Sequence, residues 1–223
     1  MTSVTSPSNR LPLSLDWEDW YQLCCPPYDA ADAHTRYEDR LAHATDLALG
    51  LCEELGAVAT WFCLADQAAR HPELLRRIVA AGHRIGLHGP DHARAFAFGR
   101  AAFVARTRDG KARLEDLAGA PVQGFRAPEW SLRGKAEGHW RDLPELGFTF
   151  DSSRAPLPVL GDPAWSTRPH RLAPGFWELP PATMDFLRWR APLWGWGMRI
   201  LPWPSLRRAL EALAAEDAGT PLV

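Results

Sequence analysis

Residues 57–64 read Ala-Val-Ala-Thr-Trp-Phe-Cys-Leu, a continuous and largely apolar run. A run of this length favours a strand buried on both faces, which is typical of a parallel sheet. On the N-terminal side, leucines at helical spacing over 37–56 end at Gly56, and on the C-terminal side an amphipathic pattern over 66–81 ends at Gly82. The stretch therefore predicts a strand between two helices, the repeating unit of a parallel α/β protein.

The same alternation continues outward along the chain. Strands often end directly before polar residues, and in parallel α/β sheets and barrels the functional site lies at the C-terminal ends of the strands. The predicted fold class is therefore α/β, with a parallel sheet or barrel. Further strands are expected at 11–16, 84–87, 122–126 and 148–150, and further helices at 99–118, 134–146 and 205–215. Within 134–146, Pro144 is expected to mark a break or a short final turn.

The segment 155–205 differs from the rest of the chain in composition. It holds 10 of the 20 prolines and six of the 11 tryptophans. A solvated linker would not carry so many tryptophans, so we expect an irregular covering region that belongs to a single domain over residues 1–223.

Composition excludes several classes of protein. The 223 residues are 46% hydrophobic and 23% charged, which is ordinary for a globular domain. The net charge of −2 argues against a nucleic-acid-binding face, and no apolar run is long enough to predict a membrane span. Residues 1–9 are polar and do not resemble a secretory signal, so we expect a cytoplasmic protein. Its four cysteines are expected to be reduced thiols: Cys24, Cys25, Cys52 and Cys63.

Polar residues gather at four of the expected strand ends. Asp16-Trp17-Glu18-Asp19 places three carboxylates within four residues, which indicates either a solvated turn or a bound cation. His88-Gly89-Pro90-Asp91-His92 follows another strand, and its glycine and proline favour a loop over a helix. The other two strand ends carry Arg126-Ala127-Pro128-Glu129-Trp130 and Asp151-Ser152-Ser153.

The two histidines are candidate metal ligands. Two imidazoles with one carboxylate from elsewhere form a three-ligand site, which leaves a coordination position open for water. That arrangement is typical of catalytic rather than structural metal sites.

Taken in order, these four motifs resemble those of the NodB-homology polysaccharide deacetylases, carbohydrate esterase family 4. The sequence between them is also similar, at residues 59–62, 71–74, 81–89 and 124–128. Residues 176–181, Phe-Trp-Glu-Leu-Pro-Pro, look like the branch of the family associated with bacterial exopolysaccharide biosynthesis. The resemblance extends over about residues 11–223.

The resemblance implies a distorted (β/α) barrel of about seven strands and a divalent metal, often zinc. It implies hydrolysis of the N-acetyl group of an amino sugar. His88 and His92 match the two metal-binding imidazoles, and Glu18 matches the metal-binding carboxylate. Asp19 is the rival for the carboxylate position.

The resemblance also implies catalytic roles for three further residues. Asp16 matches the catalytic base, and Arg126 matches the arginine that pairs with that base. Asp151 matches the acid that orients a general-acid histidine on a late strand.

That histidine is not found where the resemblance expects it. Thr220-Pro221-Leu222-Val223 is expected to open the late strand, and we expect the sequence to be part of a longer protein. The alternative is a chain in which His139 or His170 substitutes for the missing acid, or in which catalysis is impaired.

Three tryptophans lie beside these motifs. Trp17 and Trp20 flank the acidic motif, and Trp130 follows Arg126. They are expected either to pack in the interior or to form a wall on which a sugar stacks.

The leading functional hypothesis is a metal-dependent N-deacetylase with zinc as its cofactor. Its expected partner is an N-acetylated glycan, either an exopolysaccharide or its lipid-linked precursor, together with the machinery of polysaccharide biosynthesis. A non-catalytic glycan-binding or scaffold protein and an amidase that acts on a small non-sugar amide are the alternatives.

Overall fold

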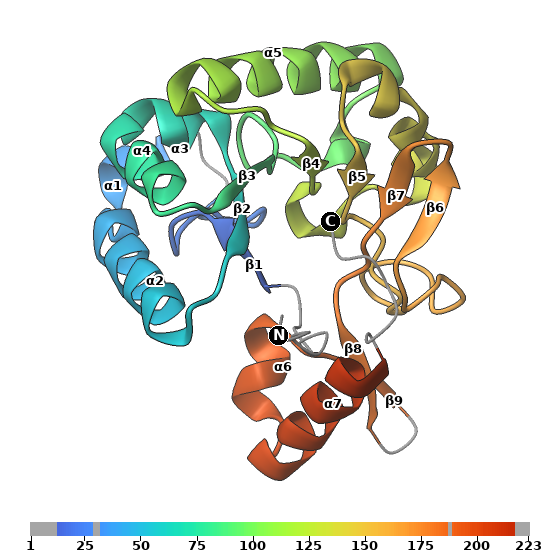
Figure 1. Ribbon diagram of the computed structural model, residues 1–223. Coiled ribbons are helices and arrows are strands. Elements are labelled where there is room, and N and C mark those ends of the chain that lie inside the picture. The colour runs from blue at the N-terminus through green and yellow to red at the C-terminus, as the bar shows by residue number, and fades with distance from the viewer. Residues whose placement is uncertain (1–12, 29–31, 187–188, 217–223) are drawn as a thin grey trace, which may run out of the picture.

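The computed structural model describes residues 13–28, 32–186 and 189–216 (Figure 1). A seven-stranded sheet forms its centre, in the order β1-β2-β3-β4-β5-β7-β6. Adjacent strands from β1 to β5 and on to β7 pair in parallel, and only β6 is antiparallel to its neighbour. The strands are β1 (Leu13–Trp17), β2 (Ala59–Cys63), β3 (Arg84–Leu87), β4 (Gly124–Phe125), β5 (Phe150–Asp151), β6 (His170–Ala173) and β7 (Phe176–Glu178).

This architecture confirms the expected α/β fold with a mostly parallel sheet. In the part of the chain that the structure describes, β1 and β6 are the two outer strands and do not pair with each other. The further strand expected at 220–223 lies outside the described residues.

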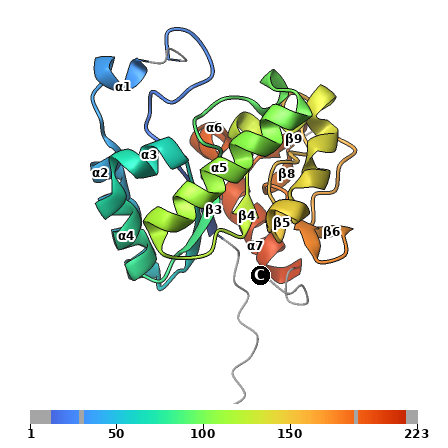
Figure 2. The same cartoon turned by 90° about the horizontal axis from the view of Figure 1, so that it is seen from above.

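Helices cover the outside of the sheet. Figure 2 shows the longest of them, α5, running across β3 and β4. None of the described helices is long and apolar enough to cross a membrane. The helices are α1 (Ala33–Arg36), α2 (Leu41–Leu55), α3 (Ala65–Arg70), α4 (Pro72–Ala80), α5 (Arg100–Ala118), α6 (Gly195–Ile200) and α7 (Trp203–Glu216), and the 3₁₀ segments are η1 (Ala95–Ala97), η2 (Pro128–Trp130), η3 (Gly134–Asp142) and η4 (Pro144–Leu146).

Two of the expected helices differ from the structure because of proline. The helix expected over 66–81 is divided into α3 and α4 at His71, whose φ of −130° and ψ of 56° lie outside the helical region. Pro72 follows it, and a proline disfavours the helical conformation in the residue before it. The segment expected to be helical over 134–146 forms two 3₁₀ segments, η3 and η4. Pro144 begins the second, in agreement with the break or short final turn expected there.

Two phenylalanine rings pack over glycines of the neighbouring strands, where the absence of a side chain leaves room for them. A Cβ on Gly86 would lie 2.6 Å from the ring of Phe62, and one on Gly124 would lie 2.3 Å from the ring of Phe150. The two rings meet edge to face, with centroids 6.3 Å apart. Any side chain at either glycine would displace a ring from the core.

The segment 155–205 is more regular than its composition predicts, and the expectation of an irregular region is wrong for its second half. Residues 170–178 add β6 and β7 to the main sheet. A separate two-stranded ladder of β8 (Thr183–Phe186) and β9 (Trp189–Pro192) follows, and α6 comes after it. Pro169 and Pro174 flank β6, and Pro192 is the last residue of β9. At such positions a proline interrupts little of the ladder. Residues 155–169 contain no helix or strand, as expected.

Candidate metal centre and active site

Glu18 and a pair of histidines about 70 residues further along the chain meet at the C-terminal edge of the sheet. Glu18 follows β1, and His88 and His92 follow β3. Oε2 of Glu18 lies 2.7 Å from Nε2 of His92 and 3.5 Å from Nε2 of His88. One ligand atom from each residue lies within 4.8 Å of the other two. Because β1, β2 and β3 are parallel neighbours, their ends bring together the residues that the sequence singled out as metal ligands.

The side chains of this cluster fit a divalent metal. Oε2 of Glu18 is buried and faces the Nε2 atoms of both imidazoles. Burial alone would raise the pKa of Glu18, but the hydrogen bonds and charges of His88 and His92 outweigh it and lower that pKa to about 2. A carboxylate oxygen and two imidazole nitrogens form a donor set that suits zinc.

Each imidazole is held by a contact at its other nitrogen. Nδ1 of His88 lies 2.8 Å from the carbonyl oxygen of Arg126, to which it donates. Nδ1 of His92 lies 3.4 Å from Sγ of Cys24. Both contacts leave Nε2 directed towards Glu18. Partners of this kind orient metal-binding histidines and fix the ring nitrogen that carries the proton.

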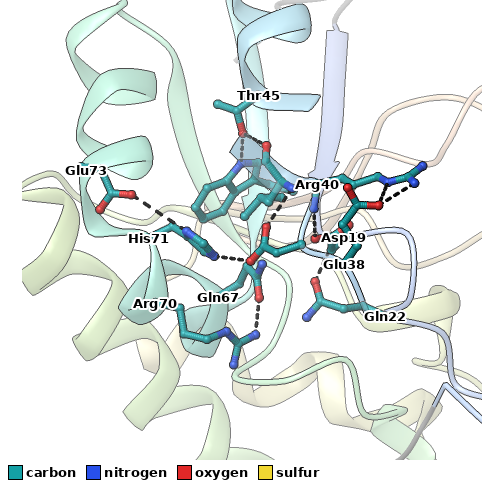
Figure 3. Close-up of polar contacts among 12 residues, drawn as sticks. Asp19, Gln22, Glu38, Arg40, Thr45, Gln67, Arg70, His71 and Glu73 are labelled. Carbon is teal, nitrogen blue, oxygen red and sulfur yellow. Dashed lines mark hydrogen bonds and ion pairs between the residues drawn. The ribbon is translucent and has the colours of Figure 1, made fainter. Parts of the chain in front are cut away.

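Asp19 does not join the cluster. Its Oδ1 accepts a hydrogen bond from the amide of Trp20 and its Oδ2 accepts one from the amide of Arg40, each at 2.8 Å. Figure 3 shows this carboxylate directed towards the chain that leads into α2. Both oxygens of Asp19 thus stabilise the loop, and Glu18 is the carboxylate that faces the imidazoles.

Asp16 lies beside the cluster in a fixed position. Its Oδ1 accepts a hydrogen bond at 2.7 Å from the buried guanidinium of Arg126. That guanidinium also donates to Ser14 at 2.9 Å and Ser152 at 2.8 Å, and it lies 4.1 Å from the ring centroid of Phe62. Arg126 therefore holds Asp16 through its side chain and His88 through its carbonyl oxygen.

Asp151 is fully buried at the end of β5, and a second buried carboxyl lies next to it. Glu178 of β7 is its register partner. Burial, opposed by hydrogen bonds from neighbours such as Ser153, raises the pKa of Asp151 to about 6. Burial and the charge of Asp151 raise the pKa of Glu178 well above its usual range. The pair thus favours holding a proton, and Glu178 is a residue that the sequence motifs did not identify.

The two histidines considered as substitute acids lie apart from the cluster. His139 is buried on η3 against Phe103, with ring centroids 5.0 Å apart. His170 begins β6 in register with Glu178, and its Nδ1 donates to the carbonyl oxygen of Arg168 at 3.0 Å. Among the described residues, neither makes a polar contact with Asp16 or the three candidate ligands.

The three tryptophans have different environments. Trp17 is only 3% exposed and its Nε1 donates to Thr45 at 2.8 Å, so the prediction that it contacts substrate is wrong. Successive side chains in a strand point to opposite faces of the sheet, so Trp17 points away from the face of β1 that carries Asp16. It packs in the core. Trp20 is 46% exposed. Trp130 is half-buried and packs against Trp194, with ring centroids 4.8 Å apart.

Comparison with known proteins places this chain in a family. The model of the polysaccharide deacetylase family matches residues 23–150, more than half of the chain. The chain belongs to the polysaccharide deacetylase family. The matched residues of this deacetylase-family protein include both histidines and Arg126, while Asp16, Glu18 and Asp151 lie outside the match. The expected family is confirmed, and its exopolysaccharide branch stays a prediction.

A curated relative of this family member comes from Bacillus cereus. It is a peptidoglycan-N-acetylglucosamine deacetylase that is 25% identical over 116 residues, which is 52% of this chain and 42% of the relative. The chain thus spans less than half of that relative's length.

Solved structures support the same fold. A candidate polysaccharide deacetylase from Mycobacterium smegmatis has a TM-score of 0.65 at 23% identity, covering 92% of this chain and 72% of that chain. Puue allantoinase has a TM-score of 0.55 at 22% identity, covering 80% of this chain and 56% of that chain. At these identities the likeness concerns the fold of the deacetylase-family chain alone.

Proposed function

We propose that this protein is a metal-dependent hydrolase that removes N-acetyl groups from an amino-sugar-containing glycan. The convergence of Glu18, His88 and His92 beside Asp16 is the observation that carries the proposal. Zinc is the proposed metal because the donor set combines two imidazoles with one carboxylate. When bound, such an ion supplies a Lewis acid and lowers the pKa of a coordinated water.

The residues around the ligands perform the remaining steps. Asp16 accepts a proton from the attacking water, since its carboxylate is partly exposed and held at a fixed place. Arg126 positions that carboxylate through its 2.7 Å hydrogen bond. Because the same arginine orients His88, it sets the position of the base relative to the metal ligands.

The buried carboxyl pair lies at the ends of β5 and β7, the same edge of the sheet. Its proposed role is the one that the resemblance implies for Asp151, the orientation of a general acid. Glu178 supports that role by keeping a proton within the pair.

An exposed aromatic side chain in the loop that carries Glu18 supports a sugar substrate. Trp20 contacts Tyr28 and Tyr37 at centroid distances of 6.0 and 5.3 Å, and these contacts hold the indole in place. Nε1 of Trp20 donates to the carbonyl oxygen of Glu38 at 3.0 Å. The exposed indole offers a rigid surface on which a sugar ring can stack.

The finer proposal concerns the substrate and its setting. We propose an exopolysaccharide or its lipid-linked precursor as the glycan, met in the cytoplasm by a protein that works with the biosynthesis machinery. The sequence Phe-Trp-Glu-Leu-Pro-Pro at 176–181 supports this branch of the family.

Release of acetate tests the proposal. Purified protein is incubated with N-acetylglucosamine oligomers, with an N-acetylated exopolysaccharide and with a small non-sugar amide, each with added Zn²⁺ or Co²⁺. We expect acetate from a glycan and none after substitution of His88→Ala. Glycan binding without acetate release would favour the non-catalytic alternative, and turnover of the small amide alone would favour the amidase.

A further inference from the structure

A cysteine thiol contacts one of the candidate metal ligands, His92, at the ring nitrogen that does not face Glu18. Sγ of Cys24 lies 3.4 Å from Nδ1 of His92. The same sulfur donates its hydrogen to the carbonyl oxygen of His92 at 2.8 Å. The thiol therefore contacts both the ring and the backbone of a single residue.

The two candidate imidazoles are held in the same manner but by different atoms. Nδ1 of His88 donates to a carbonyl oxygen, that of Arg126, at 2.8 Å. Nδ1 of His92 faces a sulfur atom, which is a weaker acceptor than a carbonyl oxygen. Cys24 thus contacts Nδ1 of His92 in the same way that Arg126 contacts Nδ1 of His88.

The loop that carries this thiol is fixed to Glu129 of η2, in the segment that follows β4. The amide of Cys24 donates to Oε1 of Glu129 at 3.2 Å, and Oε2 of Glu129 accepts from Arg94 at 2.6 Å. Glu129 has a φ of 51°, in the left-handed region that a non-glycine residue seldom adopts. Such a conformation persists only where neighbouring contacts enforce it. The hydrogen bonds of Glu129 with Cys24 and Arg94 are two such contacts.

We propose that Cys24 is a positioning residue for the metal centre: its thiol fixes the ring of His92 so that Nδ1 carries the proton and Nε2 faces the metal. This inference rests on the proposed metal site and adds a residue to it. The thiol is not itself a ligand, because it lies at Nδ1, on the side of the ring away from Glu18. Cys25, its exposed neighbour in the sequence, is the matched control.

Zinc affinity measures the effect directly. Wild type, Cys24→Ala, Cys24→Val and Cys25→Ala are titrated with Zn²⁺ in competition with a chromophoric chelator. Outer partners of metal-binding histidines typically contribute about 10–100-fold to affinity. We expect a loss of that size for both Cys24 variants, unchanged affinity for Cys25→Ala, and partial recovery for Cys24→Ser, whose hydroxyl can still accept a hydrogen bond.

The outcomes separate this inference from the proposed function. Wild-type protein that binds no zinc would contradict the metal site itself. Wild-type protein that binds zinc, with equally tight binding by Cys24→Ala and Cys24→Val, would overturn the role of Cys24 alone.

A second measurement covers the case in which the Cys24 variants do not fold. Folded Cys25→Ala protein is treated with methyl methanethiosulfonate, which converts an accessible thiol into a mixed disulfide. Cys52 and Cys63 are buried, so Cys24 is the thiol that reacts. We expect the modified protein to bind zinc about 10–100-fold more weakly. Unchanged affinity after complete modification of Cys24 would overturn the inference.

Discussion

Arg126 contacts both the proposed base, Asp16, and one candidate metal ligand, His88. Its guanidinium donates to Asp16 and its carbonyl oxygen accepts from His88. The base and one candidate ligand are therefore positioned by the residue that directly follows β4. Because the guanidinium is buried and makes further bonds to two serines, neither partner can shift independently.

Substitution of the base should separate catalysis from metal binding. Asp16→Asn keeps the shape of the side chain but removes its ability to take a proton. We expect acetate release to fall by about 10²–10⁴-fold, the usual contribution of a general base. Zinc affinity should stay at the wild-type value because Asp16 is not among the clustered ligand atoms. Equal losses of activity in Asp16→Asn and in Glu145→Gln, an exposed control, would contradict the assignment.

The carboxyl pair of Asp151 and Glu178 should make stability depend on pH. A carboxyl whose pKa is raised to about 6 in the folded protein, against 3.8 normally, costs stability when ionised. The loss of stability is complete above about pH 6, the pKa of Asp151 in the folded protein. It disappears as the pH falls from 6 towards 3.8, the ordinary pKa of the carboxyl. Arg154, whose charge lowers both pKa values, reduces the cost but does not remove it.

Glu178→Gln removes one charge of this pair and tests the effect. Unfolding by urea is measured at pH 5 and pH 7.5. The measured quantity is the free energy of unfolding of the variant minus that of wild type. We expect this difference to be more positive at pH 7.5 than at pH 5. A difference between variant and wild type that is the same at both pH values would contradict the account.

At the residue scale, position at a strand end was the informative signal. It identified Asp16, Glu18, His88 and Arg126 correctly as neighbours, because parallel strands end at one edge of the sheet. It failed for Trp17, whose alternate position in β1 turns the side chain into the core. Glu178 was missed because the burial of a carboxyl depends on the strands beside it, which the sequence does not reveal.

At the scale of elements, α2 differs from the sequence pattern in an instructive way. Leucines at helical spacing predict a helix that buries a leucine face, and the helix is present. Leu41 is buried together with Thr45 and Cys52, but Leu47, Leu51 and Leu55 are 62%, 53% and 64% exposed. Periodicity gives the helix but does not by itself show which apolar face meets the sheet.

Paired substitutions in α2 test this orientation. Leu41→Ala removes a side chain that is 1% exposed and should lower the free energy of unfolding by about 2–5 kcal/mol. Leu51→Ala should change it by no more than about 0.5 kcal/mol, since an exposed position loses little packing. Urea unfolding of both variants measures the difference. Equal losses would show that the leucine face is buried.

Other elements were predictable only in part. Strands β2 and β3 and helix α5 lie within about two residues of their expected ranges, because each combines a strong pattern with a clear end signal. Strands β6 to β9 were not expected, since each is only three or four residues long and lies in a segment rich in proline and tryptophan. Short antiparallel ladders depend on pairing between segments, and a single segment gives little indication of it.

At the scale of the whole molecule, one edge of the sheet gathers the chemistry. The candidate ligands follow β1 and β3, the positioning arginine follows β4, and the carboxyl pair ends β5 and β7. Interior glycines at 86 and 124 let Phe62 and Phe150 fill the space within the sheet. The sequence predicted this general layout from strand–helix alternation, whereas the order in which the outer strands pair required the structure.

A single divalent ion is proposed to bind between Glu18, His88 and His92. The amount of zinc bound per chain is measured by equilibrium dialysis and elemental analysis for wild type, Glu18→Gln, and the double variant His88→Ala/His92→Ala. We predict one zinc per wild-type chain, weaker binding by Glu18→Gln, and none at the same free zinc concentration in the folded double variant. Stoichiometric zinc in the double variant, or no zinc in the wild type, would contradict the claim.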